Sequence, residues 1–382
     1  VATRRARLDR APLSYAQQRL WLVQQQAPTN TAYNLPRALR LDGDLDPQAL
    51  ETALNAVIDR HDILRSAFRE IDGVPTQVVE RQTRLNLKRQ DLSSLDEDTR
   101  RLHLEQRLQT QALQPFDLSR APLIRTTLVK TAEREHVLLL NMHHIVSDAW
   151  SNAILMQDLA RAYAQASAGL APVLSELPIQ YSDYAQWQRS EYLDGVACKR
   201  ADHYWRQYLG RELPVLELPV DHARAEGQQH LAGRHSLSLE PTALQALNRF
   251  CQNEGLTPFV LAMGAWQLLL GRYSQQREFT VGVPNASRNR SDSQELVGFF
   301  VSSQVYKATL DGQQPVRDFL HALRAHSLAT LEHADYPLEL LFDQLQRGSA
   351  TSLNPLFQVL FNWRTGGGEP AAVFAPGQPR DV

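Results

Sequence analysis

The stretch HVLLLNMHHIVSDAWS, residues 136–151, decides the fold. Its four successive apolar residues, Val137–Leu140, are typical of a central strand that is buried on both faces. After the two histidines, Ser151 is expected to cap a helix that carries apolar residues at helical spacing. A buried strand, a short turn and a helix would hold the polar residues of the turn at a rigid sheet edge, from which side chains project into a cleft.

The turn itself carries His143, His144 and Asp148. An imidazole with its ordinary pKa of about 6.5 can accept a proton from an amine or alcohol that attacks a carbonyl, and then return it to the leaving group. Asp148 is expected to fix the turn or to pair with an arginine. The plainer alternative is a hydrogen-bonded structural histidine without chemistry. A metal pair is disfavoured, because adjacent strand residues point to opposite faces and no cysteine or glutamate stands at ligand spacing.

The flanking sequence predicts a mixed α/β (α+β) chain. Asp46-Pro47 is typical of a helix start, and the helix should end near Arg60. Two hairpins and several further elements follow from apolar periodicity and turn residues. The proline-punctuated stretch 170–180 is expected to link two lobes. The predicted hairpins pair 63–68 with 74–79 and 122–130 with 136–142; beyond the linker we expect a helix opened by Thr257-Pro258, a strand at 279–284, a helix at 316–333 and a buried strand at 355–363.

Composition excludes several classes of protein. Of the 382 residues, 43% are hydrophobic and 21% are charged, as in ordinary folded soluble proteins. The net charge of −2 gives no reason to expect nucleic acid or a membrane as partner. The most apolar stretch, 259–271, is shorter than the roughly 20 residues of a membrane helix, and no signal peptide is recognised at the N-terminus. Two cysteines without CxxC spacing predict neither a disulfide framework nor a zinc site, and they fit a reducing cytoplasm.

The HHxxxD pattern at 143–148 and six further segments, spread in order along the chain, resemble the motifs of the condensation domains of nonribosomal peptide synthetases. The other six are LSYAQQRLWLVQQ (13–25), RHDILRSAF (60–68), YSDYAQWQR (181–189), LVGFFVSSQV (296–305), HADYPLELL (333–341) and SLNPLFQVLF (352–361). FDLSRAPLIR and GVPNASRNR are similar as well. The resemblance therefore covers nearly the whole chain.

This resemblance implies a fold and a reaction. The expected fold is a V-shaped pair of chloramphenicol-acetyltransferase-like lobes with a tunnel between them, the N-terminal lobe spanning 1–172 and the C-terminal lobe 173–382. Because family members continue beyond the NPLFQVLF strand, the second lobe is expected to be truncated. The implied reaction is peptide-bond formation, in which the α-amine of an acceptor attacks a donor thioester. Both substrates would arrive on the 4'-phosphopantetheine of carrier proteins, beside a neighbouring adenylation domain. The domain itself would bind no cofactor and no metal, and the excised domain would be a monomer in the cytoplasm.

The resemblance also implies roles for individual residues. His144 would be the catalytic histidine, as general base or as the group that positions the amine, and His143 its buried structural neighbour. Asp148 would point away from the tunnel and pair with an arginine of the RHDILR segment, Arg60 being favoured over Arg65. Residues expected to line the tunnel are Ala149, Trp150, Ser302, Ser303 and Asn354. Arg288 and Arg290 are expected to be exposed and without a specific role, the alternative being a contact with a carrier's phosphate.

One departure from the family pattern affects the expected activity. Ala149 stands where the family has glycine, so a backbone with φ > 0 there would cost about 1 kcal/mol. Alternatives to condensation are a specialised relative that dehydrates a tethered amino acid, a non-catalytic domain that docks carriers, and an acyltransferase that uses free acyl-CoA. The amino acids joined and the chirality of the donor do not follow from the sequence.

Overall fold

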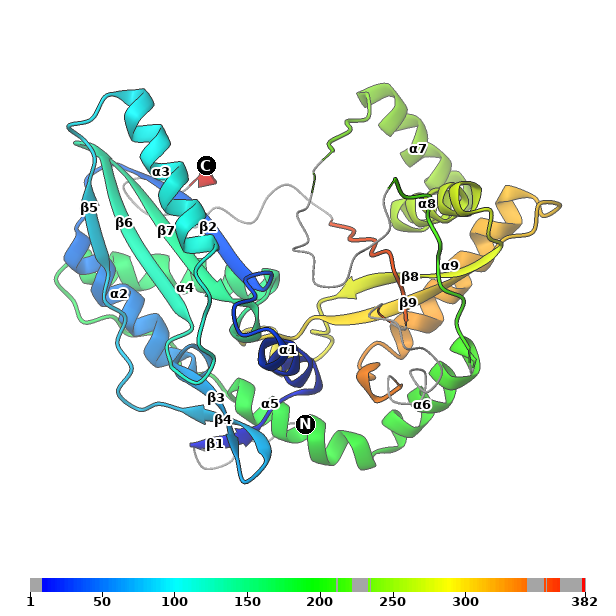
Figure 1. Cartoon of the computed structure of the whole chain (residues 1–382), viewed down its shortest axis with the longest axis horizontal. Coiled ribbons are helices and arrows are strands. Elements are labelled where there is room, and N and C mark those ends of the chain that lie inside the picture. The colour runs from blue at the N-terminus through cyan, green and yellow to red at the C-terminus, as the bar shows by residue number, and fades with distance from the viewer. Residues whose placement is uncertain are drawn as a thin grey trace. The chain divides into compact units, whose positions relative to one another are not determined.

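The computed structural model describes residues 9–210, 212–221, 233, 235–341, 354, 356–364 and 380–381 (Figure 1). The described residues form two compact units. The first contains the chain up to Cys198 together with Ala286–Val301 and residues 380–381, and the second contains the described part of 199–285 and 302–364. The lobe boundary expected after residue 172 lies within the range of the first unit.

The first unit is built on a five-stranded sheet of order β10-β2-β7-β6-β5. All neighbouring strands are antiparallel except β5 and β6, which are parallel. The expected buried strand is β7, in the middle of this sheet, and Val137–Met142 are all 6% exposed or less. The hairpin of 122–130 with 136–142 is confirmed as β6 and β7. The strands are β2 (Asn34–Asp42), β5 (Lys88–Asp91), β6 (Ile124–Ala132), β7 (Glu135–His143) and β10 (Arg380–Asp381).

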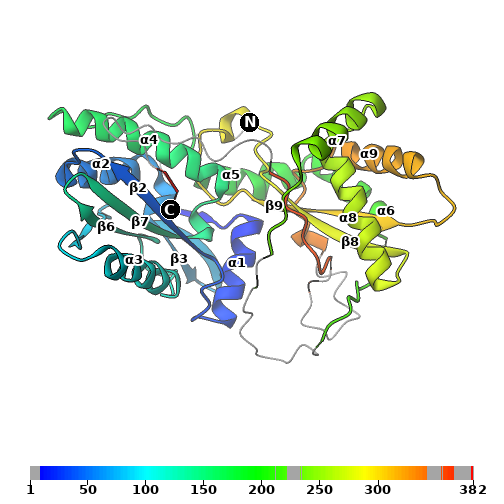
Figure 2. The same cartoon turned by 90° about the horizontal axis from the view of Figure 1, so that it is seen from above.

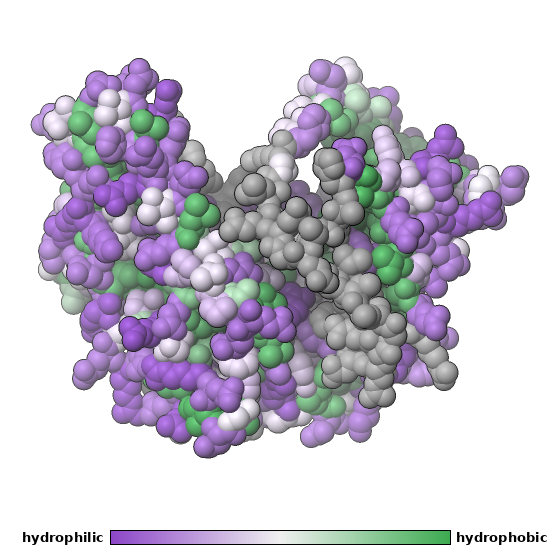
Figure 3. Space-filling view, in the orientation of Figure 1, coloured by the Kyte–Doolittle hydropathy of each residue, from purple (hydrophilic) through white to green (hydrophobic). Residues whose placement is uncertain are grey.

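Helices cover both faces of this sheet, with α2 (Pro47–Arg60) and α4 (Ala149–Ser167) on one side and α3 (Glu97–Ala112) on the other (Figure 2). Strand periodicity explains the two layers, because alternate residues of β7 point to opposite faces. Leu138, Leu140 and Met142 join the large core with α2 and α4, whereas Val137 and Leu139 join a smaller core beneath α3. Polar residues predominate on the face of this unit that Figure 3 presents.

Capping residues set where the helices begin. The prediction for α2 is confirmed: Asp46 accepts hydrogen bonds from the N–H groups of Gln48 and Ala49, and Pro47 is the first helical residue. The expected cap of α4 is wrong. The helix begins at Ala149, and Asp148 is its cap. Ser151 lies in the first turn, where its N–H donates to Asp148 Oδ1 at 2.7 Å. A carboxylate at this position also complements the positive end of the helix dipole.

The rest of the first unit packs beside the sheet. The other predicted hairpin is present as β3 (Ser66–Ile71) and β4 (Val74–Val79), which β1 (Arg10–Pro12) extends to three strands. Its first strand begins at Ser66 and not at residue 63, because Asp62–Arg65 form a 3-10 turn. The segment 170–180, expected as a linker between lobes, belongs to this unit, and Leu177 and Ile179 are buried in its core. The remaining elements are α1 (Tyr15–Gln26), 3-10 turns at Asp62–Arg65, His144–Val146 and Ser291–Ser293, α5 (Tyr181–Trp187) and a π-helical turn at Gln188–Tyr192.

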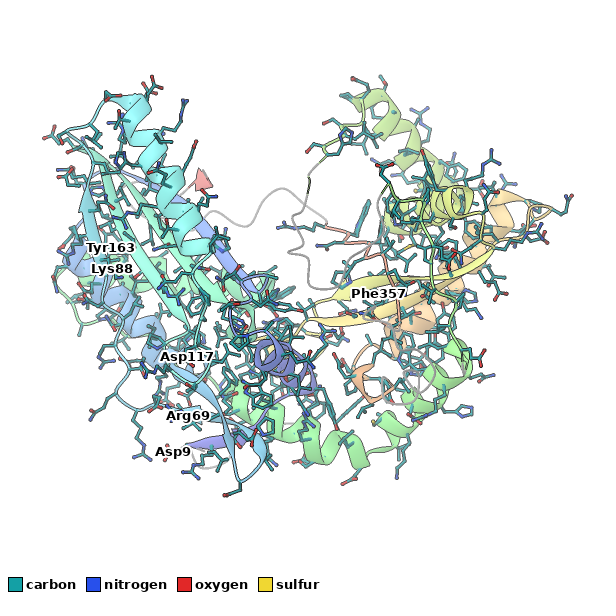
Figure 4. All side chains as sticks on the ribbon, in the orientation of Figure 1. Asp9, Arg69, Lys88, Asp117, Tyr163 and Phe357 are labelled. Atoms are coloured by element: carbon teal, nitrogen blue, oxygen red, sulfur yellow. The ribbon has the colours of Figure 1, made fainter. Side chains whose placement is uncertain are left out.

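The second unit packs helices around the hairpin of β8 (Glu278–Asn285) and β9 (Ser302–Thr309). β8 confirms the strand predicted at 279–284. The strand predicted at 355–363 is wrong over the described residues 356–364, where Leu360 forms a single parallel bridge with Gly282 and the ring of Phe357 lies against β8 (Figure 4). Pro355 lies outside the described residues. The helices are α6 (Val196–Leu209), α7 (Pro241–Glu254), α8 (Pro258–Ser274) and α9 (Val316–Glu332).

Candidate active site

The two histidines lie at the end of β7, which continues into a 3-10 turn at His144–Val146. The backbone holds this turn at both histidines. The N–H of His143 donates to Leu123 O at 3.1 Å, and the N–H of His144 donates to Tyr33 O at 2.8 Å. The side chain of Gln17, which is fully buried, donates from Nε2 to Ile145 O at 3.2 Å. The turn is therefore fixed to the residues just before β6 and β2 and to α1 (Tyr15–Gln26).

The ring of His144 has a defined tautomer when it is neutral. Its Nδ1 lies 2.7 Å from the backbone oxygen of Ser147. A carbonyl oxygen only accepts hydrogen bonds, so Nδ1 carries the hydrogen and Nε2 keeps a free lone pair. His144 is half-buried, and the ring of Phe299 packs against its ring at a centroid distance of 4.8 Å, close to edge-on. This arrangement leaves Nε2 as a proton acceptor.

His143 has a different environment. It is 1% exposed, and its Nδ1 accepts the N–H of Ile145 at 3.1 Å, so that its hydrogen resides on Nε2. Burial, with a smaller contribution from His144, lowers the pKa of His143 to about 3. The residue therefore stays neutral at ordinary pH, and its hydrogen bond to Ile145 shapes the turn that carries His144.

The carboxylate of Asp148 makes a network of buried hydrogen bonds. Its oxygens accept from Arg288 Nη2 at 3.1 and 3.3 Å, and Oδ2 also accepts the N–H of Phe300 at 3.1 Å. The side chains of Asp148 and Arg288 are each 1% exposed. Burial lowers the pKa of the Arg288 guanidinium, and Asp148 opposes that shift. The expected exposure of Arg288 is therefore wrong.

The expected partner of Asp148 is also wrong. Arg60 pairs with Asp158 and donates from Nε to Ser175 O at 2.9 Å. Asp158 lies ten residues beyond Asp148 in the sequence, about 15 Å further along the helix. Arg60, at the end of α2, meets α4 at that later position. Arg65 pairs with Asp62.

The segment 298–300 is held against the same turn by side-chain hydroxyls. Ser151 Oγ donates to Gly298 O at 2.9 Å and accepts from Gly298 N at 3.0 Å and from Arg288 Nη2 at 2.8 Å. Tyr181 donates to Phe299 O at 2.5 Å, and burial raises its pKa well above the ordinary value. These contacts determine where the Phe299 ring meets His144.

Sequence reasoning missed the roles of Arg288, Ser151 and Tyr181. The signal was weak but present, because each of these residues lies in a segment that resembles a family motif. A buried aspartate also requires a cation.

The residues expected to line a tunnel fall in both units. Ala149 and Trp150 are exposed at the start of α4, and Trp150 Nε1 donates to Gln294 O at 3.0 Å. Ser302 and Ser303 are the half-buried first residues of β9. Asn354 is exposed, and its Oδ1 accepts the N–H of Leu356 at 2.9 Å. Their contact with substrate stays a prediction.

Two other kinds of site are not found in the part of the chain that the structure describes. Within those residues, no group of three or more His, Cys, Asp or Glu residues could hold a metal ion. None of the helices among the described ranges combines the length and apolar character needed to cross a membrane.

Comparisons with known proteins agree over most of the chain. The family model described as "Condensation domain" matches residues 7–367. A linear gramicidin synthase protein of Brevibacillus parabrevis is 41% identical over 350 residues, which are 92% of this chain and 4% of that protein. Malpinin synthetase of Mortierella alpina is 35% identical over 353 residues, again 92% of this chain and 4% of the relative. The chain thus spans only a small part of the relatives that it matches.

Solved structures share the fold. The X-domain from teicoplanin biosynthesis has a TM-score of 0.85 and 28% identity, with 94% of this chain and 79% of that chain covered. The first condensation domain of the CDA synthetase has a TM-score of 0.75 and 20% identity, with 98% and 87% covered. The α/β (α+β) fold class expected from the sequence is thereby confirmed.

Proposed function

Because the chain belongs to the condensation domain family, we propose that it is an amide-forming acyltransferase of a nonribosomal peptide synthetase. The donor is an aminoacyl or peptidyl thioester, and the acceptor is the α-amine of an aminoacyl thioester. Both are tethered to the 4'-phosphopantetheine of carrier proteins. The observation that carries this proposal is the lone pair on His144 Nε2. The turn that carries His144 is held in place by His143 and by a buried Asp148–Arg288 pair.

The reaction exchanges a C–S bond for a C–N bond. The amine nitrogen attacks the thioester carbonyl carbon, the new amide bond forms, and the bond to the pantetheine sulfur breaks. His144 Nε2 accepts the proton that the amine loses and returns it to the departing thiolate. An α-amine has a pKa of about 7.7–8.0, so part of it is already neutral and no strong base is required. Positioning of the amine therefore accounts for much of the rate.

The other motif residues act on geometry. Asp148 joins the start of α4, Arg288 and the 298–300 segment, all of which surround the His144 turn. Its carboxylate is already occupied by these donors, which supports an architectural role. The hydrogen bond from His144 Nδ1 to Ser147 O fixes the orientation and the tautomer of the ring. A carboxylate can have this role beside a histidine, but the backbone oxygen places no charge next to the ring.

The remaining assignments follow from the family. We propose that Ala149, Trp150, Ser302, Ser303 and Asn354 contact the tethered substrates. Donor and acceptor carriers and an adjacent adenylation domain are the proposed partners, in the cytoplasm.

One observation supports a second candidate, a domain that docks other proteins without catalysis. Among the similar structures is a complex of the X-domain and OxyB from teicoplanin biosynthesis, at 27% identity and a TM-score of 0.85. A domain that only docks other proteins would not need His144 Nε2 as a proton acceptor.

The test uses matched donor and acceptor carriers loaded with aminoacyl groups, followed by mass spectrometry of each carrier. Condensation adds the donor acyl mass to the acceptor carrier and leaves the donor carrier with a free thiol. A specialised dehydrating relative removes one water from a loaded carrier, and a docking domain leaves both masses unchanged. Turnover with free acyl-CoA and a soluble amine or alcohol would identify the fourth class. Any of these last three results contradicts the proposal.

A further inference from the structure

Three buried polar side chains lie together on the sheet face beneath α3. Asn34 of β2 is directly opposite His143 of β7, and Asn141 precedes His143 by two residues on the same strand. Residues that are opposite each other, or two apart, share one face of a sheet. Asn34, Asn141 and His143 are 8%, 0% and 1% exposed.

Hydrogen bonds to the end of α3 fix the orientation of both amides. Asn34 Nδ2 donates to Ala112 O at 2.7 Å and to Gln114 O at 3.0 Å. Asn141 Nδ2 donates to Gln111 O at 2.6 Å. These partners are backbone carbonyls in and just after the last turn of α3. Since a carbonyl oxygen only accepts, neither amide can be turned around.

The remaining polar atoms of the two amides and of the His143 ring have no partner among the described residues. They are Asn34 Oδ1, Asn141 Oδ1 and His143 Nε2, and all three are buried. Because His143 Nδ1 accepts from Ile145, Nε2 is a donor, so these three residues present one unmatched donor and two unmatched acceptors. Burial without a partner is energetically unfavourable for each of these atoms.

We infer that Asn34, Asn141 and His143 form a binding site for one buried water molecule. The water oxygen accepts from His143 Nε2–H, and its two hydrogens donate to the two amide oxygens. Three partners of this kind are typical of buried waters. The water belongs to the protein interior, on the sheet face that α3 covers.

The site has a consequence for catalysis, and this step rests on the proposed function. The hydrogen bond from Ile145 N to Nδ1 fixes the hydrogen of His143 on Nε2. The water pairs that hydrogen, so the ring holds the turn of His144 without leaving a buried donor unpaired. Asn141 and Asn34 are therefore positioning residues that act through His143.

The first test is a high-resolution crystal structure of the wild-type chain. A water peak within hydrogen-bond distance of all three atoms is the expected result. A site without such a peak, with His143 Nε2–H directed at the ring of Phe116, whose centroid is 6.1 Å from that of His143, overturns the inference.

The second test compares Asn141→Leu with Thr126→Val. Thr126 is a matched control, because its hydroxyl is also buried and has no partner among the described residues, but it lies on the neighbouring strand β6 with its side chain on the other sheet face. Crystal structures of the two variants report whether the water is bound, whatever reaction the chain catalyses. Should Asn141→Leu fail to fold, Asn34→Ala replaces it in the same comparison.

We expect Asn141→Leu to lose the water peak from its crystal structure and to lower kcat by about tenfold to a hundredfold with little change in KM. Thr126→Val should retain the water peak and near wild-type kcat. An Asn141→Leu variant with an unchanged water peak and wild-type kcat contradicts the inference. Loss of the water peak in a chain that shows no condensation would instead leave the water site standing and reject the proposed function.

Discussion

Replacing Asp148 by asparagine should destabilise the first unit. The carboxylate accepts from Ser151 N, Phe300 N and Arg288 Nη2, and it neutralises a guanidinium that is 1% exposed. An amide keeps one acceptor oxygen but turns an NH2 group toward the remaining donors. Breaking one side of a buried ion pair costs about 3–5 kcal/mol, which corresponds to a fall in Tm of about 10 °C for a unit of this size.

Thermal and urea unfolding, followed by circular dichroism, measure this loss directly. The matched control is Asp59→Asn, which breaks the pair with Arg84, whose side chains are 50% and 63% exposed. That variant should lose less than about 1 kcal/mol. The double variant Asp148→Leu with Arg288→Met should be less destabilised than the sum of the two single variants, because neither charge is then left unpaired.

Stability and activity together decide the role of Asp148. If Asp148 has an architectural role, Asp148→Asn lowers both the stability and the activity of the protein. An Asp148→Asn variant with wild-type Tm and no turnover would refute that role, and would assign the carboxylate to the chemistry.

Three further outcomes are expected. Ala149→Gly should change the condensation rate by less than about tenfold, because Ala149 is the first residue of α4 and already has helical backbone; a rise of a hundredfold or more in a rate assay would contradict this. Gly298→Ala should cost about 1–3 kcal/mol in urea unfolding, because the added Cβ would lie 2.0 Å from the ring of Tyr181, whereas Gly312→Ala, which meets nothing within 4 Å, should be neutral. As pH falls, His143 takes up a proton in the unfolded chain before it does in the folded chain, where its pKa is about 3. The free energy of unfolding should therefore fall by about 1 kcal/mol per pH unit between about pH 6 and about pH 4. His143→Asn should reduce this pH dependence in unfolding curves, and an unchanged dependence would contradict a buried, neutral imidazole.

The sequence predicted the elements whose local signals agree with their tertiary environment. The apolar run at 137–140 is the central strand β7, and Asp46-Pro47 starts α2 because cap and proline act within one turn. The strand expected at 355–363 shows the limit of such signals. An apolar run becomes a strand only where a neighbour pairs with it, and over the described residues only Leu360 forms a bridge.

The candidate site divides in the same way. The HHxxxD turn and its position after a buried strand were predictable, because strand, turn and helix are contiguous in sequence. The partner of Asp148 was not, since Arg288 is 140 residues away and the choice between arginines depends on packing. Arg60 was the nearer candidate in sequence, but its position on α2 brings it to Asp158.

The buried hydroxyls show why some side chains escaped sequence reasoning. Ser151 looked like a helix cap because serine is favoured there. Its hydroxyl instead holds Gly298 and Arg288, contacts that only the folded chain creates.

The most direct test of the central claim is the single-turnover rate of His144→Ala with loaded donor and acceptor carriers. Removing a general base that also positions the amine should lower the rate by at least about a hundredfold, while carrier binding and Tm stay close to those of the wild-type chain. The mass of the acceptor carrier, followed over time, supplies the rate. A His144→Ala variant that forms the amide at the wild-type rate would contradict the assignment of His144 Nε2 as the proton acceptor.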